Sequence, residues 1–381
     1  MSSAAQLDRY AADPWPEWQV PRGNLTPGGA QLAGYLGTYW REHYRSLGLL
    51  APGDCAGVWF HANKTQRTVA TAEAVAHALL PSCTAAIDTV PDGSADPLFD
   101  AVSAGVAVPD YAVAEAAVLG RIGNQPAAWT AAQWGAVVDL QRLMLDCTGE
   151  ACQPLADQGK QLLTAIPTTV ARGKGSDLVA LDGPLPTASG LTESLMMAYA
   201  DGVPLARLAG GRLTEQRLLE AGVLHGADMD LRLRTPYIAR MTTSYLARRL
   251  LDAVQGGDLL AKPDKRMVVL VGHDGNLIEF SGLLSIDWLV PGYQPNQVPP
   301  GGALIFERWT RADGKEVVRL RFEVQSLHQM HGRIPLGANE PPLSAPVFIP
   351  GCSESGPSYD CSLDGFQGVM NAAIDPASAG P

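Results

Sequence analysis

A histidine and a carboxylate stand side by side where a strongly apolar segment ends. Residues 267–271, MVVLV, are all apolar, Gly272 follows, and His273 and Asp274 come next. In open α/β sheets, ligands bind at the carboxyl ends of the strands, where an imidazole and a carboxylate can serve as acid, base or hydrogen-bond donor. A simpler alternative is that Asp274 only caps the helix that follows it.

A second segment of the same kind carries an arginine. Residues 57–63, GVWFHAN, are typical of a strand, and residues 65–80, TQRTVATAEAVAHALL, are typical of a helix with Arg67 in its first turn. A helix N-terminus carries partial positive charge, so an arginine there favours a phosphate or carboxylate ligand. The alternative is a solvated surface arginine. We assign none of the remaining histidines as a nucleophile: His61 is expected in the core or rim, and the others lie in helical patterns (His43, His77, His225) or after the 317–327 strand (His328, His331).

Other elements follow from local signals. Thr26 as N-cap and Pro27 at the first helical position predict a helix that packs through Leu36, Tyr39 and Trp40. Residues 303–309 and 317–327 predict a hairpin through Asp313-Gly314, with the apolar residues Val318, Leu320, Phe322 and Val324 alternating against Arg319, Arg321 and Glu323.

The middle of the chain has a different sequence pattern from the two ends. From about Pro109 to Asp230 the pattern is alanine-rich and helical, with few strand signals. One helix should place Trp134, Val138 and Leu145 on a single stripe, and another should open at Thr192 and Glu193. We therefore expect an α/β domain, built from residues 1–107 and 233–381, that is interrupted by a mostly helical domain of residues 108–232.

Composition bounds the class of protein. The 381 residues, 46% hydrophobic and 18% charged, predict a soluble globular protein of about two structural units. A net charge of −11 with no basic stripe excludes nucleic acid as a partner, and no apolar run reaches the roughly 18 residues of a membrane helix. We expect neither a nucleic-acid nor a membrane partner, and the sequence leaves the oligomeric state open.

Six cysteines form three sequence-close pairs: Cys55 and Cys83, Cys147 and Cys152, Cys352 and Cys361. None of the pairs has the spacing of a metal site, so disulfides are the better interpretation, and disulfides persist in oxidising compartments. The N-terminal residues, however, are polar and show no signal peptide. Either the cysteines are reduced, or the true N-terminus lies upstream of Met1.

Taken in order, the segments WPEWQVPRGNLTPGG, ANKTQRTVATAEA, LTESL, VGHDGN, VPPGGALIFERW and GCSESGPSYDCSLDGF resemble the bacterial periplasmic histidine acid phosphatases. The likeness is strongest to their glucose-1-phosphatase and 6-phytase branch and covers nearly the whole chain. It implies a phosphoglycerate-mutase-like mixed sheet flanked by helices, with an inserted mostly helical domain. It also implies hydrolysis of a small phosphomonoester through a phosphohistidine, without metal or other cofactor, in the periplasm or outside the cell.

The resemblance assigns roles to particular residues. His273 would contact the transferred phosphate, Asp274 would protonate the leaving alcohol, and Arg67 would clamp phosphate oxygens. Glu193 would lie near the leaving group, and the three cysteine pairs match disulfides of the family. Phytase members carry a further arginine shortly after RTP, where this chain has Arg240 and then Thr242.

One family motif has no match. The family nucleophile lies in RHGxRxP at the end of a first strand, and RHG does not occur in this chain. We expect the chain to lack that strand, its histidine and a signal peptide through a single N-terminal truncation, and to turn over little as written. The alternatives are a non-catalytic protein that binds a phosphate compound and, less favoured because of the cysteine pairs, a cytosolic mutase-type enzyme.

Overall fold

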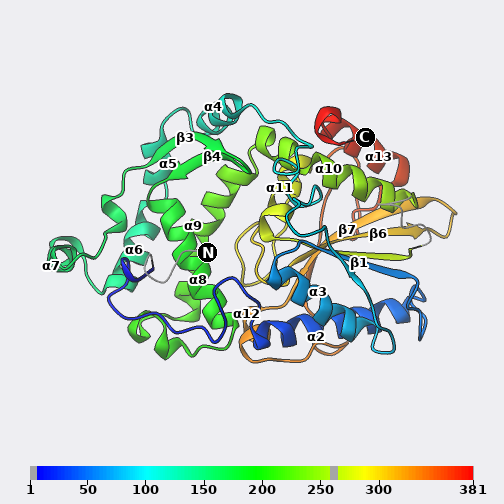
Figure 1. Cartoon of the computed structure of the whole chain (residues 1–381), viewed down its shortest axis with the longest axis horizontal. Coiled ribbons are helices and arrows are strands. Elements are labelled where there is room, and N and C mark those ends of the chain that lie inside the picture. Colours follow the sequence, from blue (N-terminus) through cyan, green and yellow to red (C-terminus); the bar gives the residue numbers. More distant parts are fainter. Residues whose placement is uncertain (1–6, 258–264, 381) are drawn as a thin grey trace.

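The computed structural model describes residues 7–257 and 265–380 (Figure 1). The longer helices are α2 (Pro27–Ser46), α3 (Gln66–Leu79), α4 (Tyr111–Arg121), α6 (Trp134–Leu145), α8 (Pro184–Ala200), α9 (Glu215–Leu233), α10 (Pro236–Gln255), α11 (Asp274–Leu284) and α13 (Leu363–Ala373). Shorter helices are α5 (Pro126–Ala131), α7 (Gln153–Asp157) and α12 (Leu327–His331). The strands are β1 (Val58–Ala62), β2 (Ile87–Asp88), β3 (Thr169–Lys174), β4 (Asp177–Asp182), β5 (Met267–Val271), β6 (Ala303–Thr310), β7 (Glu316–Val324), β8 (Leu343–Pro346) and β9 (Cys361–Ser362). The predicted mixed α/β class is confirmed.

The strands form three sheets. β2, β1 and β5 are parallel in the order β2-β1-β5, and β6, β7 and β8 are antiparallel in the order β6-β7-β8. β9 also pairs with β7, so β8 and β9 share the outer edge of that strand. The third sheet is the β3–β4 hairpin, which lies at the end of the molecule opposite the other two sheets (Figure 1).

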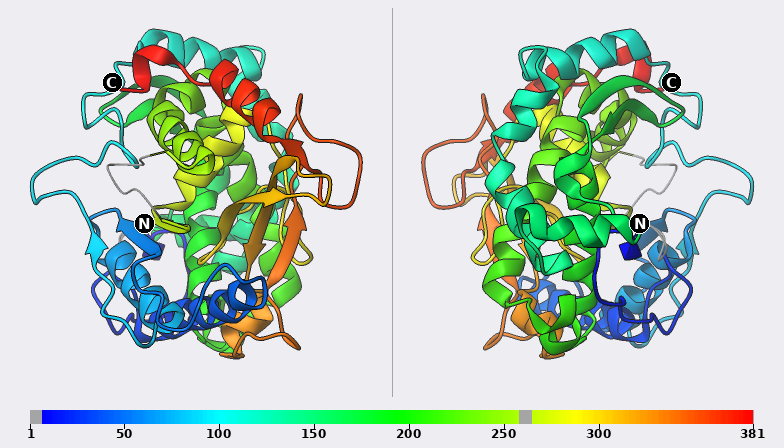
Figure 2. Two further views of the ribbon diagram at one scale, coloured as in Figure 1. Left: turned by 90° about the vertical axis from the view of Figure 1, so that its right-hand side faces the viewer. Right: turned by 90° about the vertical axis from the view of Figure 1, so that its left-hand side faces the viewer.

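Helices cover the strands on both sides (Figure 1). On one side, β1 and β5 pack against a cluster that includes Leu36 and Trp40 of α2 and Val75 and Leu79 of α3. On the other side lie α10 and α13, and Figure 2 shows α13, in red, against the orange strands of the β6–β7 hairpin. A parallel arrangement with both faces covered explains why the β1 sequence is nearly all apolar.

The predicted start of α2 is confirmed. Thr26 is the N-cap, its Oγ1 accepts a hydrogen bond of 2.9 Å from Gly29 N, and Pro27 occupies the first helical position. Leu36 and Trp40 are buried. The cap fixes where the helix begins, and its apolar stripe fixes which face meets the sheet.

The predicted β6–β7 hairpin is also confirmed, with one exception to its alternation. Val318, Leu320 and Phe322 are buried as expected, but Glu323, assigned to the polar face, is only 1% exposed. Its Oε1 accepts a 2.5 Å hydrogen bond from Trp40 Nε1, and its Oε2 lies 3.5 Å from Arg321 Nε. Burial raises the pKa of Glu323, and the Arg321 charge opposes this. The polar face of the hairpin is therefore packed under α2 instead of facing water.

The β3–β4 hairpin accounts for the few strands in the described middle of the chain, which is otherwise largely helical. One prediction there was wrong: α8 begins at Pro184, after Gly183 at φ 146°, so Thr192 and Glu193 lie in mid-helix and do not open it. A glycine in a conformation closed to other residues, followed by proline at the first helical position, is a stronger start signal than Thr192.

The stripe predicted for α6 was wrong as well. Trp134 is 41% exposed, and the buried positions are Val137, Leu140, Gln141, Leu143, Met144 and Leu145. The buried face is thus rotated by about one residue from the expected one. Trp134 is the first residue of the helix, where a large side chain can extend past the packed face.

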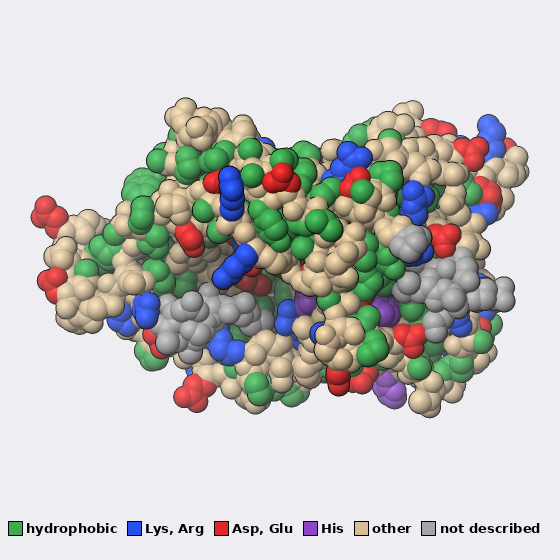
Figure 3. All heavy atoms as spheres, turned by 45° about the horizontal axis from the view of Figure 1, so that its top comes forward, with side chains coloured by type: hydrophobic (Ala, Val, Ile, Leu, Met, Phe, Trp, Pro, Cys, Tyr) green, Lys and Arg blue, Asp and Glu red, His purple; other side chains and the backbone are tan. Residues whose placement is uncertain are grey.

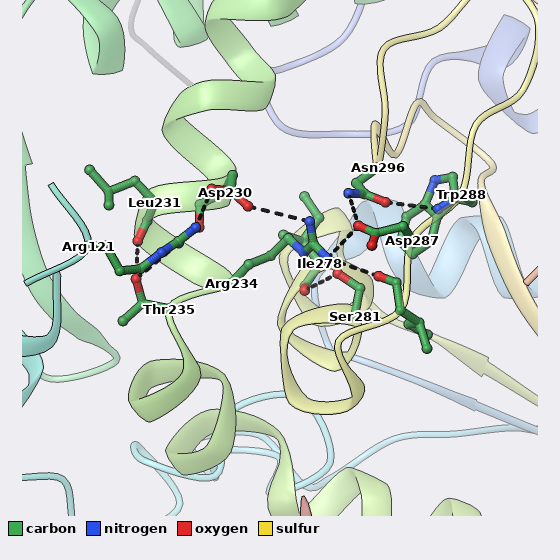
Figure 4. Close-up of polar contacts among 11 residues, drawn as sticks. Arg121, Asp230, Leu231, Arg234, Thr235, Ile278, Ser281, Asp287, Trp288 and Asn296 are labelled. Carbon is green, nitrogen blue, oxygen red and sulfur yellow. Dashed lines mark hydrogen bonds and ion pairs between the residues drawn. The ribbon is translucent and has the colours of Figure 1, made fainter. Parts of the chain in front are cut away.

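Arg234, just after α9, connects the end of α9 to the segment that follows α11 (Figure 4). Its Nη2 donates to Asp287 Oδ1 at 2.8 Å and to the Ile286 carbonyl at 2.9 Å, both beyond the end of α11. Its Nη1 lies 3.4 Å from Asp230 Oδ1. Asp287 also accepts from Asn296 Nδ2 at 2.6 Å. This set of contacts fixes the end of α9 against the segment that follows α11.

All three cysteine pairs are disulfide-bonded, as predicted, with sequence separations of 28, 5 and 9 residues. The alternative of reduced cysteines was therefore wrong. Among the described residues, no helix is long and apolar enough to cross a membrane.

Replacing Cys147 and Cys152 together by serine is expected to lower the free energy of unfolding by about 2 kcal/mol, because a short ring removes little chain entropy from the unfolded state. Urea denaturation followed by circular dichroism measures the change. Wild-type protein under reducing conditions should lose more, since all three rings then open. A midpoint that does not shift in the double variant would contradict the expectation.

Candidate functional site

The parallel pairing of β1 and β5 brings the two sequence-predicted segments to one place. Ala62 is in register with Val271, the last residues of their strands, and Asn63 N donates to Val271 O at 2.9 Å. Both strands therefore end at the same edge of the sheet, and each is followed by a helix. The N-termini of α3 and α11 lie at this edge, where the partial positive charge of a helix start favours an anion.

Arg67 and His273 are in direct contact there. Arg67 Nη2 lies 3.1 Å from His273 Nδ1, and Arg67 Nη1 lies 3.4 Å from the Gly23 carbonyl. A guanidinium can only donate, so His273 Nδ1 is the acceptor and the ring proton sits on Nε2. Burial lowers the pKa of His273, and the Arg67 charge lowers it further against the opposing effect of Asp274. At neutral pH the site therefore holds a neutral imidazole beside a fixed positive charge.

Asp274 is the first residue of α11, and its Oδ1 accepts from Gly275 N at 2.9 Å. The N-cap position of this helix belongs to His273. The alternative in which Asp274 serves as the N-cap was therefore wrong. The alternative of a solvated Arg67 was also wrong, because that side chain is partly buried and bonded to His273.

Glu193 lies on α8, which is distant in sequence from both α3 and α11. Burial raises its pKa, and the Asp274 carboxylate raises it further, whereas His225 and Arg67 act in the opposite direction. Arg67 and His273 are in contact, and Glu193 lies near enough for the charges of Asp274 and Arg67 to act on its pKa. Figure 3 shows a hollow between the two halves, with acidic, basic and histidine side chains at its floor.

A small cavity of about 10 Å³ lies behind Glu193. Its walls include Thr192, His225 and Tyr293. The Thr192 hydroxyl is buried without a hydrogen-bond partner, while His225 Nδ1 lies 2.9 Å from Ser189 Oγ. The other walls include Met196, Leu218, Leu219 and Leu327, so the lining of this cavity is largely apolar.

Sequence reasoning missed the residues that hold the site in place. His225 and Asn276 were not chosen, although Asn276 lies only two residues after Asp274. His61, expected in the core or rim, is in the core: its Nε2 lies 2.7 Å from Asp96 Oδ2, and both side chains are buried. Within residues 7–257 and 265–380, no group of three or more His, Cys, Asp or Glu side chains could hold a metal ion.

Comparison with known protein families identifies the family of the chain. The model of the histidine phosphatase superfamily (branch 2) matches residues 5–173 and 229–323 of the chain. The chain is a member of the histidine phosphatase superfamily, branch 2. The matched span contains Arg67, His273 and Asp274, and it leaves out Glu193.

The relatives of this histidine phosphatase are phosphate-ester hydrolases. Phytase AppA of Escherichia coli is 34% identical over 96% of this chain and 86% of that protein, and glucose-1-phosphatase of Salmonella typhimurium is 27% identical over 98% and 88%. The apo form of Hafnia alvei phytase matches with a TM-score of 0.90 at 32% identity over 100% of this chain and 94% of the other. The same phytase has been solved with myo-inositol hexakis sulphate, at a TM-score of 0.87 over 98% and 93%.

Proposed function

We propose that this histidine phosphatase hydrolyses phosphomonoesters in an acidic environment, with a sugar phosphate such as glucose 1-phosphate, or phytate, as substrate. The observation that carries the proposal is the contact of Arg67 with a neutral His273, directly beside Asp274. A guanidinium, an Nε2 proton and two helix N-termini converge there, which is the set of donors that a phosphoryl group needs. The phytase and glucose-1-phosphatase relatives support the same class of substrate.

The proposed reaction has two steps. The imidazole nitrogen of a nucleophilic histidine attacks phosphorus, the ester P–O bond breaks, and Asp274 gives its proton to the departing alcohol oxygen. Water then attacks the phosphohistidine and returns a proton to Asp274, which releases orthophosphate. Arg67 and His273 hold the equatorial oxygens in both steps, and Glu193 lies toward the leaving group.

We propose that the nucleophile sits on a further strand between β5 and β6. Within the described ranges, β5 pairs only with β1, and β6 only with β7. All five residues of β5 are half-buried, whereas all five of β1 are buried. Met267 and Val269 of β5 and Ala303 and Ile305 of β6 contact one apolar cluster, so a strand inserted between them would continue the same layer. Without that strand, residues 1–381 should have little activity.

Two further features belong to this proposal. Three disulfides support a periplasmic or secreted location, because such bonds persist in oxidising compartments. The helices and hairpin between α4 and α9 support a helical domain of residues 108–232, inserted into an α/β domain of residues 1–107 and 233–381. The site then lies where the two domains meet.

Calorimetric titration with orthophosphate at pH 5 tests the proposed site directly. We expect one orthophosphate to bind per chain and to be displaced by glucose 1-phosphate, because the donors meet at a single point. Reading the DNA upstream of the first codon tests the nucleophile: an in-frame segment encoding RHGxRxP is expected. Binding of phosphate compounds without hydrolysis by a chain that includes such a segment would instead identify a binding protein.

A further inference from the structure

The C-terminal end of α8 is held by side chains of another element. Arg333 lies two residues after α12; its Nη1 donates to Ala200 O at 3.1 Å and its Nη2 donates to Asp201 O at 2.8 Å. His331 Nδ1 lies 2.9 Å from Tyr199 O. The last carbonyls of a helix have no partner within it, and the helix dipole favours a positive charge beside them. Arg333 and His331 therefore cap α8.

The same guanidinium meets the start of α2 (Figure 1). Arg333 Nη2 lies 3.1 Å from Asp201 Oδ1, and that oxygen accepts a 2.5 Å hydrogen bond from Thr26 Oγ1, the N-cap of α2. A Cβ on Gly28 would lie 2.6 Å from Asp201 Oδ1 and closer still to Arg333 Nη2, so both groups lie against the first turn of α2. These four residues form what we call the α8–α2 junction.

The residues before α2 connect this junction to the anion site. Gly23 O lies 3.4 Å from Arg67 Nη1. Leu25 N donates to Gln66 Oε1, at the start of α3, at 2.9 Å. The segment that leads into α2 therefore lies along the first turn of α3, and Thr26 continues it into the α8–α2 junction. The end of α8 is thus fixed relative to the guanidinium that is proposed to hold the phosphate.

We infer that Arg333 is a positioning residue, which fixes α8, and with it Glu193, at the separation from Arg67 that the alcohol part of a phosphate ester requires. The inference rests on the proposed function, in which Glu193 lies toward the leaving group. Glu193 precedes Asp201 by eight residues, or about 12 Å along the helix, so a tilt of this end of α8 moves its carboxylate. A displacement of about 1 Å is enough to weaken a contact that depends on alignment.

Two ligands separate a positioning role of Arg333 from a general role in folding. Orthophosphate would meet Arg67 and His273 alone, whereas glucose 1-phosphate would extend to Glu193. Because residues 1–381 should have little activity, both ligands can be titrated calorimetrically at pH 5 without turnover. In R333A the affinity for glucose 1-phosphate should fall about tenfold, while that for orthophosphate should stay within about twofold of wild type. An equal loss for both ligands, or no loss for glucose 1-phosphate, would overturn the inference.

Two further variants test the route of the effect. R333K keeps a cation that can donate to the carbonyls of α8, so it should recover most of the lost affinity for glucose 1-phosphate. E193A should weaken glucose 1-phosphate about tenfold by itself, and adding R333A to it should cause no further loss, because two residues that act through one contact are not additive. Additive losses, or wild-type affinity in E193A, would show that Arg333 does not act through Glu193 and would refute its role.

R212A is the matched control. Arg212 caps another helix, α6, through a 2.9 Å hydrogen bond to Leu143 O, and it pairs with Asp13 at 2.7 Å. Its side chain is 22% exposed and that of Arg333 is 23% exposed, so the two substitutions remove similar contacts. None of the proposed site residues lies on α6. The ratio of the two ligand affinities in R212A should therefore match wild type.

A readout without ligand separates failure of this inference from failure of the proposed function. Titration followed by ¹³C NMR of the glutamate carboxyl groups measures the pKa of Glu193, whose signal is the one missing in E193A. Burial and the charge of Asp274 raise that pKa, so it should move toward its ordinary value if Glu193 is displaced in R333A. If wild type binds neither ligand, the proposed function fails. The lowered pKa would then still support the positioning role of Arg333, and an unchanged pKa would contradict it.

Discussion

A chain extended at its N-terminus by the proposed strand, with its nucleophilic histidine, is expected to hydrolyse p-nitrophenyl phosphate at least about 10⁴-fold faster than residues 1–381 alone. In the proposed mechanism residues 1–381 contain the proton donor, Asp274, and the phosphate clamp, Arg67, but neither can form the covalent intermediate. Covalent catalysis replaces one difficult displacement by two easier ones, and that gain disappears without the nucleophile. Initial rates at pH 5 with both chains measure the effect.

The control is the same extended chain with its added histidine replaced by alanine. It should fold as the active chain does and return to the rate of residues 1–381, because the strand then fills the sheet without supplying chemistry. Comparable rates for all three proteins would rule out the proposed strand as the source of the nucleophile. Activity that appears equally with histidine and with alanine would assign the gain to folding.

Replacing Arg67 by alanine is expected to weaken orthophosphate binding at pH 7 by about 3–4 kcal/mol, or several hundred-fold in Kd. Arg67 supplies a partly buried charge and donates to His273 Nδ1, so the variant loses a charge-assisted contact and leaves that nitrogen without its donor. Calorimetric titration measures the loss. Wild-type affinity in the variant, within about twofold, would remove Arg67 from the site.

The same substitution changes the pH dependence in a definite direction. Arg67 helps to lower the pKa of His273, so its removal raises that pKa and allows the imidazole to become charged at a higher pH. Part of the lost affinity should therefore return as the pH falls, which a folding defect would not produce. R172A is the control, because Arg172 is exposed and pairs only with Glu115, at 3.1 Å on the surface. Its titration should match wild type.

Much of the fold could be predicted because its signals are local. The Thr26 cap, the apolar runs before Arg67 and His273, and the Asp313-Gly314 turn each specify an element through residues adjacent in sequence. Convergence of Arg67 with His273 and Asp274 followed from a general rule on strand ends. Glu193 was placed by family resemblance alone, because no periodicity indicates that an acid in the middle of a buried helix reaches a site on another part of the chain.

The missed features depend on contacts that the local pattern does not contain. Glu323 alternates like a surface residue, and it is buried because Trp40 of α2 covers it; Arg321, two residues earlier on β7, pairs with it. The β3–β4 hairpin has mostly exposed side chains on β3, so its alternation is weak. Asn276 looked like an ordinary polar position of a helix, since its importance comes from Phe99, which is distant in sequence.

The way the sheet edges are closed has a consequence for handling the protein. β8 and β9 together occupy the outer side of β7, and β2, at the opposite margin, is only two residues long. Within the described residues, β5 and β6 each keep one unpaired edge, as do the strands of the β3–β4 hairpin. Because β5 ends where His273 and Asp274 lie, a molecule that pairs with β5 is expected to crowd the proposed phosphate site. Added phosphate is then expected to slow the association of residues 1–381, which light scattering would measure.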